Sequence, residues 1–449
     1  MDFRYKDYLT APLELLRILS DWKKFEALSK AEMDEYILAK LRNICIYAQK
    51  HVPYYTKLFE DISFDPEKLT SFEYYRKIPV MNKEIVRQHF DELQSDELKK
   101  LGAVICETSG STGTPLKFYL DKNVNRASFC LFYKTWSMAD DWKLGSRQVT
   151  LTGYAEGMYQ YQWKTNILAL SSFYLSEENV ELFYSLIKKY KPKVLRGYPS
   201  ALYLFAKLLE KKGLQLTFKT MFTGAETLLP FQRKYIEEFF GGKIIDHYTH
   251  WERTASICNC KCGKLHAQNF YGYHEIVDDN GNPVENGIKG RLVCTGLYNL
   301  AMPLLRYDTR DIAAFSVNQT CDCGSLLPVI DGIEGRIEDI VVTPEGRLVG
   351  RLDAAFKYSK NIRLANIYQS QKEYITVNIV PDDGYNYESD EKPIIEELRK
   401  RLGNQIDIRI KYVSESEIPR TKAGKVRFVI SEVMKNNDDM KVVERIERG

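Results

Sequence analysis

Residues 193–247 read KVLRGYPSALYLFAKLLEKKGLQLTFKTMFTGAETLLPFQRKYIEEFFGGKIIDH. In this stretch, short apolar runs alternate with longer segments whose apolar residues recur every three or four positions. The first pattern is typical of buried strands, and the second of amphipathic helices. The elements predicted here are, in chain order, 193–195 (strand), 200–212 (helix), 218–222 (strand), 230–240 (helix) and 243–247 (strand). This alternation predicts βαβ units and a mainly parallel sheet.

The alternation continues on both sides of this stretch and defines a large α/β domain. It extends over residues 103–340, with a further strand predicted at 148–152 and a further helix at 180–191. The first part of the chain has a helical pattern instead. Its second predicted helix ends at His51, because Pro53 disfavours helix in the residue before it.

The C-terminal part of the chain has a different pattern. A predicted strand at 367–379 is followed by a helix at 392–402 and a strand at 406–413. This order is typical of a small α+β domain. We therefore predict an α/β protein with a large N-terminal domain over residues 1–338, helical up to about residue 100. The small C-terminal domain is predicted over residues 339–449.

Composition and charge exclude several classes of function. The 449 residues include 64 lysines and arginines and 61 aspartates and glutamates, which leaves a formal charge of +3. So small an excess gives no electrostatic reason to expect nucleic acid or an anionic membrane as a partner. No apolar run approaches the ~18 residues that a membrane span needs. The first residues lack the apolar core of a signal peptide, so we expect a cytoplasmic protein.

Two cysteine clusters predict a structural metal site. An odd total of nine cysteines and tight Cys-x-Cys-Gly spacing argue against a disulfide framework. Zinc is expected, because it takes four nitrogen or sulfur ligands. The clusters span residues 258–266 and 321–324, and their candidate ligands are Cys260, Cys262, His266, Cys321 and Cys323. Two solutions fit: the four cysteines together, or His266 in place of a free Cys262.

Residues 107–115 read ETSGSTGTP and form a loop rich in glycine and hydroxyl groups. Glycines allow the backbone to approach a phosphate closely, while exposed N–H groups and hydroxyls bind the anion. The loop is no Walker A motif, because it lacks the Gly-Lys-Ser/Thr ending. Its candidate phosphate-binding residues are Thr108, Ser109, Gly110, Ser111, Thr112 and Gly113.

This loop is the first of six motifs that together resemble the adenylate-forming enzymes, in particular their phenylacetate-CoA ligase and CapK-like branch. The other five are Gly224-Ala225-Glu226, the segment from Asp246 to Glu252, the segment from Arg306 to Asp311, Gly335-Arg336 through Asp339, and the segment from Pro419 to Lys425. Their order and spacing fit the family over nearly the whole chain. The two cysteine clusters also lie where zinc-binding members of this branch carry theirs.

The resemblance implies an activity and its cofactors. The protein would use ATP and Mg²⁺ to convert a small carboxylic acid to an acyl-adenylate, and would then transfer the acyl group to coenzyme A. Zn²⁺ would be structural. Lys425 would bridge the carboxylate and the α-phosphate, while Thr112 and Glu252 would place Mg²⁺. Asp339 would be the hinge of a mobile C-terminal lid domain.

The same resemblance implies a nucleotide site. Beyond the phosphate loop, Asp311 would bind the ribose hydroxyls with support from Arg336, and Tyr248 would stack on adenine. The remaining nucleotide-binding residues that it implies are Gly224, Ala225, Glu226, His247 and Thr249.

Three residues depart from the family motifs and keep other functions open. Thr249 and Arg310 replace glycines, and Trp251 replaces a hydroxyl residue before Glu252. One alternative is a CapK-like ligase that passes the acyl group to an amine or sugar in polysaccharide or secondary-metabolite biosynthesis. Another is a nucleotide-binding protein without catalytic activity. The sequence also leaves open whether the protein forms a homodimer.

Overall fold

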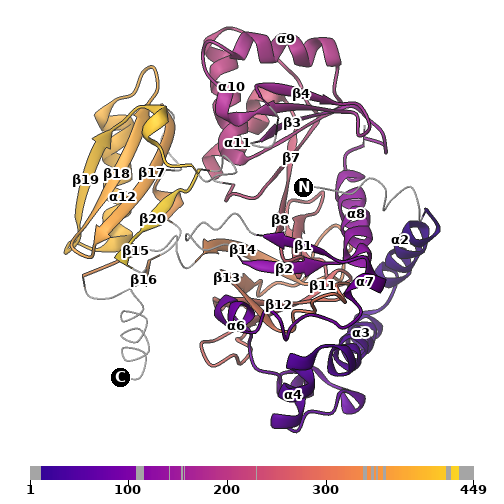
Figure 1. Cartoon of the computed structure of the whole chain (residues 1–449). Helices are drawn as coiled ribbons and strands as arrows, with labels where there is room; N and C mark the ends of the chain where they lie inside the picture. The colour runs from indigo at the N-terminus through magenta and orange to yellow at the C-terminus, as the bar shows by residue number, and fades with distance from the viewer. Residues whose placement is uncertain are drawn as a thin grey trace. The chain divides into compact units, whose positions relative to one another are not determined.

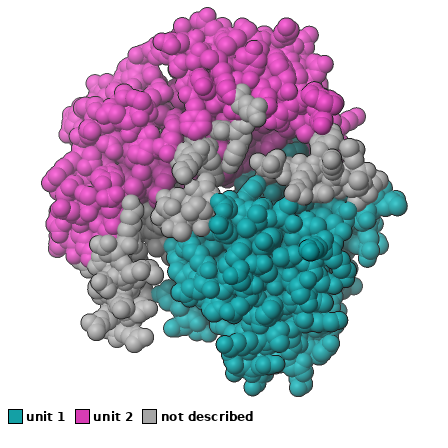
Figure 2. Space-filling model, viewed as in Figure 1, with its two compact units in different colours: residues 1–140, 247–333 teal, residues 141–246, 334–449 magenta. Residues whose placement is uncertain are grey.

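The computed structural model shows a chain divided into two compact units, each made of two separate segments (Figure 2). Unit 1 comprises residues 1–140 and 247–333, and unit 2 comprises residues 141–246 and 334–449. These units are not the two predicted domains, since each combines two separate segments of the chain. The predicted domain boundary after residue 338 stays a prediction. The residues that the structure describes are 12–107, 116–140, 142–152, 155, 157–228, 230–336, 341–344, 348–349, 352–356, 361–420 and 426–433.

Helices dominate the N-terminal segment of unit 1, as the sequence predicts (Figure 1). These helices are α2 (Pro12–Glu26), α3 (Lys30–His51), α4 (Pro53–Asp61), α5 (Phe72–Tyr75), α6 (Lys83–Gln88), α7 (Leu98–Leu101) and α8 (Lys122–Trp136). A capping box between Ser29 and Glu32 begins α3, and the helix ends at His51 because Val52 is extended before Pro53. The apolar core beneath these helices includes Trp22, Phe25, Ile37, Leu41, Tyr55 and Phe59.

The strands that lie wholly or partly in unit 1 pair in the order β11-β12-β13-β14-β10-β9-β8, where β8 begins and β14 ends in residues of unit 2. Strands β1 and β2 form a separate hairpin. Their bounds are β1 (Val104–Glu107), β2 (Lys117–Leu120), β8 (Lys243–Thr249), β9 (Ser256–Asn259), β10 (Leu265–Ala267), β11 (Gly272–Val277), β12 (Gly290–Gly296), β13 (Tyr307–Phe315) and β14 (Val329–Arg336). The pairings from β8 to β10, β10 to β14 and β11 to β13 are antiparallel. The expected parallel pairing does not extend here, because turns such as residues 278–283 contain no crossover helix.

The first segment of unit 2 has the predicted parallel arrangement. Its strands follow the order β7-β6-β3-β5-β4, and the pairs β3–β5, β3–β6 and β6–β7 are parallel. The bounds are β3 (Gln148–Thr152), β4 (Tyr159–Gln162), β5 (Ile167–Ser171), α9 (Val180–Tyr190), β6 (Val194–Gly197), α10 (Pro199–Lys211), β7 (Thr220–Gly224) and α11 (Pro230–Phe240). Apolar faces of the three helices pack with the strands in one core, which includes Val149, Leu151, Phe183, Leu202, Phe205 and Ile236. The mixed α/β fold class predicted from the sequence is confirmed.

The C-terminal segment of unit 2 forms a four-stranded sheet in the order β19-β18-β17-β20, with α12 packed on it (Figure 1). The bounds are β15 (Val341–Val342), β16 (Leu348–Val349), β17 (Ile362–Gln371), β18 (Tyr374–Pro381), α12 (Lys392–Leu402), β19 (Asp407–Tyr412) and β20 (Val429–Ser431). The single strand predicted at 367–379 is two strands, because the charged pair Lys372-Glu373 forms the turn between β17 and β18. Over the described residues, no helix has both the length and the apolar character needed to cross a bilayer.

A buried carboxylate joins α8 to the sheet segment of unit 1. Asp121 is fully buried and caps α8, where it accepts hydrogen bonds from the backbone N–H groups of Asn123 at 2.7 Å and Val124 at 3.0 Å. Its other oxygen accepts from the backbone of Leu300 at 2.7 Å and Ala301 at 3.2 Å. One side chain therefore satisfies donors from two segments far apart in the sequence.

Asp121→Ala should lower the free energy of unfolding by about 3 kcal/mol or more, because it leaves buried N–H groups without an acceptor. Chemical denaturation of the purified protein measures this change. Asp34→Ala is the matched control, since Asp34 pairs with Lys30 at 2.9 Å on the exposed face of α3. The control should change stability by under about 0.5 kcal/mol. Equal effects of the two substitutions would contradict the structural role given to Asp121.

Candidate functional site

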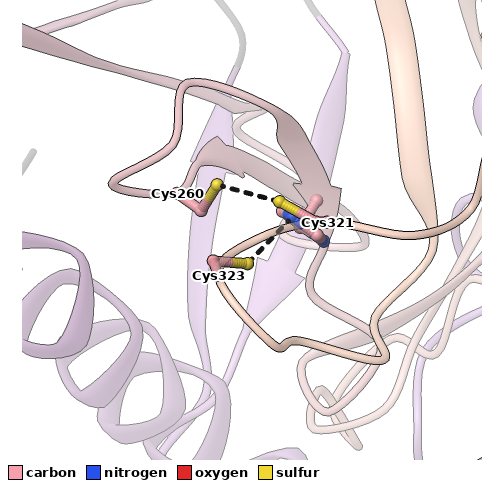
Figure 3. A group of neighbouring side chains, drawn as sticks. Cys260, Cys321 and Cys323 are labelled. Atoms are coloured by element: carbon pink, nitrogen blue, oxygen red, sulfur yellow. Dashed lines mark hydrogen bonds between the residues drawn. The ribbon is translucent and has the colours of Figure 1, made fainter.

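Four of the five predicted metal ligands meet in unit 1. Cys260, His266, Cys321 and Cys323 each offer a ligand atom, and these atoms all lie within 4.8 Å of one another. The Sγ atoms of Cys260 and Cys321 are 3.6 Å apart, as are Cys323 Sγ and His266 Nε2. Figure 3 shows the three cysteine sulfurs turned toward one another. Cys262 is exposed and is not part of this group, so the arrangement is the alternative that includes the histidine.

Two tight turns present the cysteines. In the turn between β9 and β10, the N–H of Gly263 donates to Cys260 O at 2.9 Å. In the loop between β13 and β14, the N–H of Gly324 donates to Cys321 O at 2.9 Å. Both glycines have positive φ, +86° and +76°, which other residues adopt only with strain. The Cys-x-Cys-Gly pattern therefore folds locally as the sequence indicates.

The donor types suit a zinc ion, and the two 3.6 Å distances match the edges of a tetrahedral site. Ligands at ~2.3 Å for sulfur and ~2.0 Å for nitrogen lie about 3.6–3.8 Å apart on a tetrahedron. His266 Nδ1 donates a hydrogen bond to Leu327 O at 3.1 Å, which leaves the lone pair of Nε2 available on the side of Cys323. The backbone N–H of Cys323 lowers the pKa of the Cys321 thiol to about 6, with a further contribution from the His266 ring. Burial raises the pKa of the neighbouring Cys323 thiol, and the thiolate is the form that binds metal.

A second group surrounds the buried carboxylate of Glu252, just after β8. Tyr307 Oη, at the start of β13, donates to Glu252 Oε1 at 2.9 Å. His250 Nδ1 donates to Glu252 Oε2 at 2.9 Å, and His250 Nε2 shares a hydrogen bond with Thr254 Oγ1. Burial acts to raise the pKa of Glu252, but the hydrogen bond and charge of His250 and the charge of Lys83 hold it well below its usual range. Glu252 is therefore a buried anion.

The same two strands bring together two predicted nucleotide-binding residues. Tyr248, in β8, donates a short hydrogen bond from Oη to Asp311 Oδ2 in β13. Burial raises the pKa of Tyr248 well above its usual value, and the Asp311 charge adds to this effect. The phenol therefore remains a donor at neutral pH. The two motifs that contain Tyr248 and Asp311 are thus linked twice, here and through Tyr307 and Glu252.

The other predicted residues of this region are placed differently. His247 is buried with its Nε2 sharing a hydrogen bond with Ser256 Oγ at 2.8 Å, and its ring lies edge-on to Phe132 at 5.3 Å. Thr249 is half-buried at the end of β8. Sequence reasoning missed Tyr307 and gave His250 no defined partner, although both lie within motifs that it identified.

In unit 2, the motif Gly224-Ala225-Glu226, predicted to bind nucleotide, lies at the end of β7. Gly224 ends this strand, and Ala225 has a positive φ of +69°. Glu226 then accepts hydrogen bonds from the backbone N–H groups of Ser200 at 3.1 Å and Val426 at 2.8 Å. The motif is therefore joined to the start of α10 and to the C-terminal segment.

Several predicted site residues lie outside the described residues. They are Thr108, Ser109, Gly110, Ser111, Thr112, Gly113, Asp339 and Lys425, and the side chain of Arg336 at the end of β14 belongs with them. Their roles stay predictions.

Comparisons with known proteins agree with this picture. The CapK C-terminal domain family matches residues 341–432. Protein CapK of Staphylococcus aureus is 24% identical over 399 residues, covering 86% of this chain and 86% of its own. Phenylacetate-coenzyme A ligase of Thermus thermophilus is 24% identical over 374 residues, covering 79% of this chain and 78% of its own. The chain is thus similar to CapK and to the phenylacetate-coenzyme A ligases.

A solved structure extends the likeness to the fold. The structure of 2-hydroxyisobutyryl-CoA ligase, in the postadenylation state with its acyl-adenylate, superposes with a TM-score of 0.72. The sequences are 19% identical, and the match covers 95% of this chain and 94% of that one. The chain therefore shares the fold of this ligase.

One departure from the family motif has a structural explanation. Arg310 stands where the family has glycine, and its φ of +66° lies in the left-handed region that glycine favours. The residue is held there by its backbone N–H, which donates to Asp308 Oδ1 at 2.8 Å. Its guanidinium also pairs with Glu84 Oε1 at 2.5 Å. Local contacts therefore hold a strained arginine directly before Asp311.

Arg310→Gly should leave the protein more stable than Arg310→Ala by about 1 kcal/mol, since both lose the guanidinium but only glycine relieves the strain. Denaturation curves of the two variants measure this difference. At exposed Asn43, in the interior of α3, the order should reverse, because glycine weakens a helix relative to alanine by about 1 kcal/mol. An alanine variant at 310 as stable as the glycine variant would contradict the strain argument.

Proposed function

We propose that this protein joins a carboxylic acid to coenzyme A through an acyl-adenylate. One observation within unit 1 carries the proposal. The motif after β8 and the motif at the start of β13 are joined by the hydrogen bonds Tyr248–Asp311 and Tyr307–Glu252. Two ionisable carboxylates are thereby placed on neighbouring segments, at the motif positions that the family resemblance links to Mg²⁺ and to the ribose.

The reaction has two steps. In the first, a carboxylate oxygen of the acid bonds to the α-phosphorus of ATP, and the bond from that phosphorus to the bridging oxygen breaks as pyrophosphate leaves. In the second, the thiolate of coenzyme A bonds to the acyl carbon, and AMP leaves with the electron pair of the broken C–O bond. Charge develops on phosphoryl oxygens, so the site needs cations and N–H donors rather than a protein nucleophile.

The residues have distinct roles in this proposal. Glu252 remains ionised at neutral pH and supplies the carboxylate oxygens that Mg²⁺ prefers, together with the hydroxyl of Thr112. Mg²⁺, when bound, neutralises phosphate charge. Asp311 accepts hydrogen bonds from the ribose hydroxyls, and Lys425 supplies positive charge to the reacting carboxylate and α-phosphate.

The similarity to CapK supports a second candidate function, in which the acyl group passes to a different acceptor. The C-terminal domain matches the CapK family, and CapK itself matches over most of the chain. A CapK-like ligase would perform the same first step and pass the acyl group to an amine or a sugar. The two functions differ only in the acceptor, so the second step separates them.

Acid-dependent exchange of labelled pyrophosphate into ATP tests the first step. A panel of aryl and short-chain carboxylic acids should include at least one that supports exchange in the presence of Mg²⁺. Lys425→Ala should lower this exchange by about 100- to 1000-fold, because one charge-stabilising contact is lost from the transition state. The same variant should still convert preformed acyl-adenylate to thioester with coenzyme A.

The outcomes of this test distinguish the alternatives. Lys234→Ala is the control, since Lys234 is exposed on α11, and it should retain full exchange. Absence of exchange with every acid would support a protein that binds nucleotide without catalysis. Exchange without thioester formation would support the amine or sugar acceptor. Equal loss of both half-reactions in Lys425→Ala would overturn the role given to the lysine.

We also propose that Cys260, His266, Cys321 and Cys323 hold a structural zinc ion. Three sulfurs and one imidazole make a closed donor set that leaves no position for a substrate. The ion would tie the turn after β9 to the loop after β13. The loop after β13 continues from the strand that carries Asp311, and the turn after β9 continues from a strand that pairs with β8.

Metal analysis of the purified protein should find about one zinc per chain. Cys321→Ser should lose the metal and lower the melting temperature, because a structural zinc site contributes folding energy. Cys262→Ser should keep the metal, since Cys262 is outside the group of four. Zinc well below one per chain in the wild type would remove the proposal. Loss of zinc in Cys262→Ser, with retention in His266→Ala, would instead support the four-cysteine solution.

A further inference from the structure

The carboxylate of Glu226 joins two segments of unit 2 that are far apart in the sequence. Glu226 Oε2 accepts the backbone N–H of Ser200 at 3.1 Å, in the first turn of α10. Glu226 Oε1 accepts the backbone N–H of Val426 at 2.8 Å, in the C-terminal segment. Hydrogen bonds to an ionised acceptor are stronger than those between neutral groups.

The contact with Ser200 fixes the side chain to the first segment of unit 2. Helix α10 begins at Pro199, and its N-cap residue Tyr198 makes no side-chain capping bond. A negative group placed at this end also interacts favourably with the helix dipole. The positive φ of Ala225 turns the chain after β7 just before the carboxylate. Glu226 is therefore held by the sheet and the helix, independently of the C-terminal segment.

The contact with Val426 lies beside a β-bridge within the C-terminal segment. Arg420 and Val426 form an antiparallel bridge, so the two residues lie opposite each other. Burial lowers the pKa of Arg420, and the charge of Glu226 opposes this shift. The carboxylate thus interacts with both residues of the bridge. Lys425 is covalently bonded to Val426.

Helix α10 makes further polar contacts with the same C-terminal segment. Tyr203 Oη donates to Ile362 O at 3.0 Å, and Lys207 pairs with Asp382 at 3.6 Å. Helix capping alone would require only the Ser200 contact of Glu226. The other carboxylate oxygen, Oε1, instead accepts the backbone N–H of Val426, the residue that follows Lys425 in the chain.

We propose that Glu226 is a positioning residue for the first half-reaction, because it anchors the backbone at Val426 and so fixes the chain to which Lys425 is bonded. This inference rests on the proposed function, and it gives the predicted nucleotide-binding motif Gly224-Ala225-Glu226 a second role. The motif would couple the nucleotide region to the lysine-bearing segment through one carboxylate. Glu226 itself would contact neither the acid nor the α-phosphate.

The test compares Glu226→Ala and Glu226→Gln with Glu238→Ala. Glu238 is exposed on α11 and pairs with Lys234 at 3.9 Å, which makes it a control outside the proposed site. The alanine variant should lower pyrophosphate exchange about 10- to 100-fold, which corresponds to loss of a charged hydrogen bond. Conversion of preformed acyl-adenylate by coenzyme A should change by less than about twofold. Glutamine keeps one acceptor oxygen, so its exchange rate should be intermediate.

A second measurement does not depend on activity. Hydrogen–deuterium exchange followed by mass spectrometry reports on the amide of Val426, which should exchange faster in Glu226→Ala than in the wild type or in Glu238→Ala. If the alanine variant does not fold, the glutamine variant provides the same comparison.

The two measurements separate the failure of this inference from the failure of the proposed function. Unchanged deuterium uptake at Val426 would overturn the anchor, whatever the wild-type activity. Faster uptake together with unchanged pyrophosphate exchange, or with equal loss of both half-reactions, would overturn the positioning role. A wild type inactive with every acid would remove the proposed function and this role with it, while the uptake measurement would still decide whether Glu226 anchors Val426.

Discussion

Burial of two carboxylates between neighbouring motifs is the constraint on which the proposed chemistry of unit 1 depends. An ionised carboxylate removed from water is strongly destabilising unless hydrogen bonds compensate. Tyr307 and His250 provide this compensation for Glu252, and Tyr248 provides it for Asp311. The tyrosines are donors that remain protonated because they are buried, so the negative charge stays on the carboxylates.

The cysteine group lies in the loops that continue from the same part of the sheet. The turn bearing Cys260 joins β9 to β10, and the loop bearing Cys321 and Cys323 joins β13 to β14. Because β10 also pairs with both β9 and β14, His266 is brought beside the two loops. A metal held by these four residues would restrain strands that begin or continue within a few residues of Glu252 and Asp311.

Strained backbone occurs at the motifs as well as at Ser63, Asn166 and Lys191. Ala225, Arg253, Arg306 and Arg310 all have positive φ without being glycine. Arg306 shows how such a conformation is held. Its guanidinium donates to Glu275 and to the backbone carbonyls of Arg76, Ile78 and Gly281. Residues in this backbone region are destabilising by about 1–3 kcal/mol each, and they persist where surrounding contacts fix them.

The sequence by itself determined the kinds of local structure and the positions of the motifs. The capped helix ending at His51, the parallel strands around residues 193–247 and the two cysteine turns all depend on periodicity or on residues close together in the chain. Only the tertiary structure decided that His266 rather than Cys262 completes the group of four, and that Tyr307 and Tyr248 hold the two carboxylates. The same is true of the contact between Glu226 and Val426. The physical reason is that these choices depend on the direction in which side chains from separate strands point, and spacing along the chain does not encode that direction.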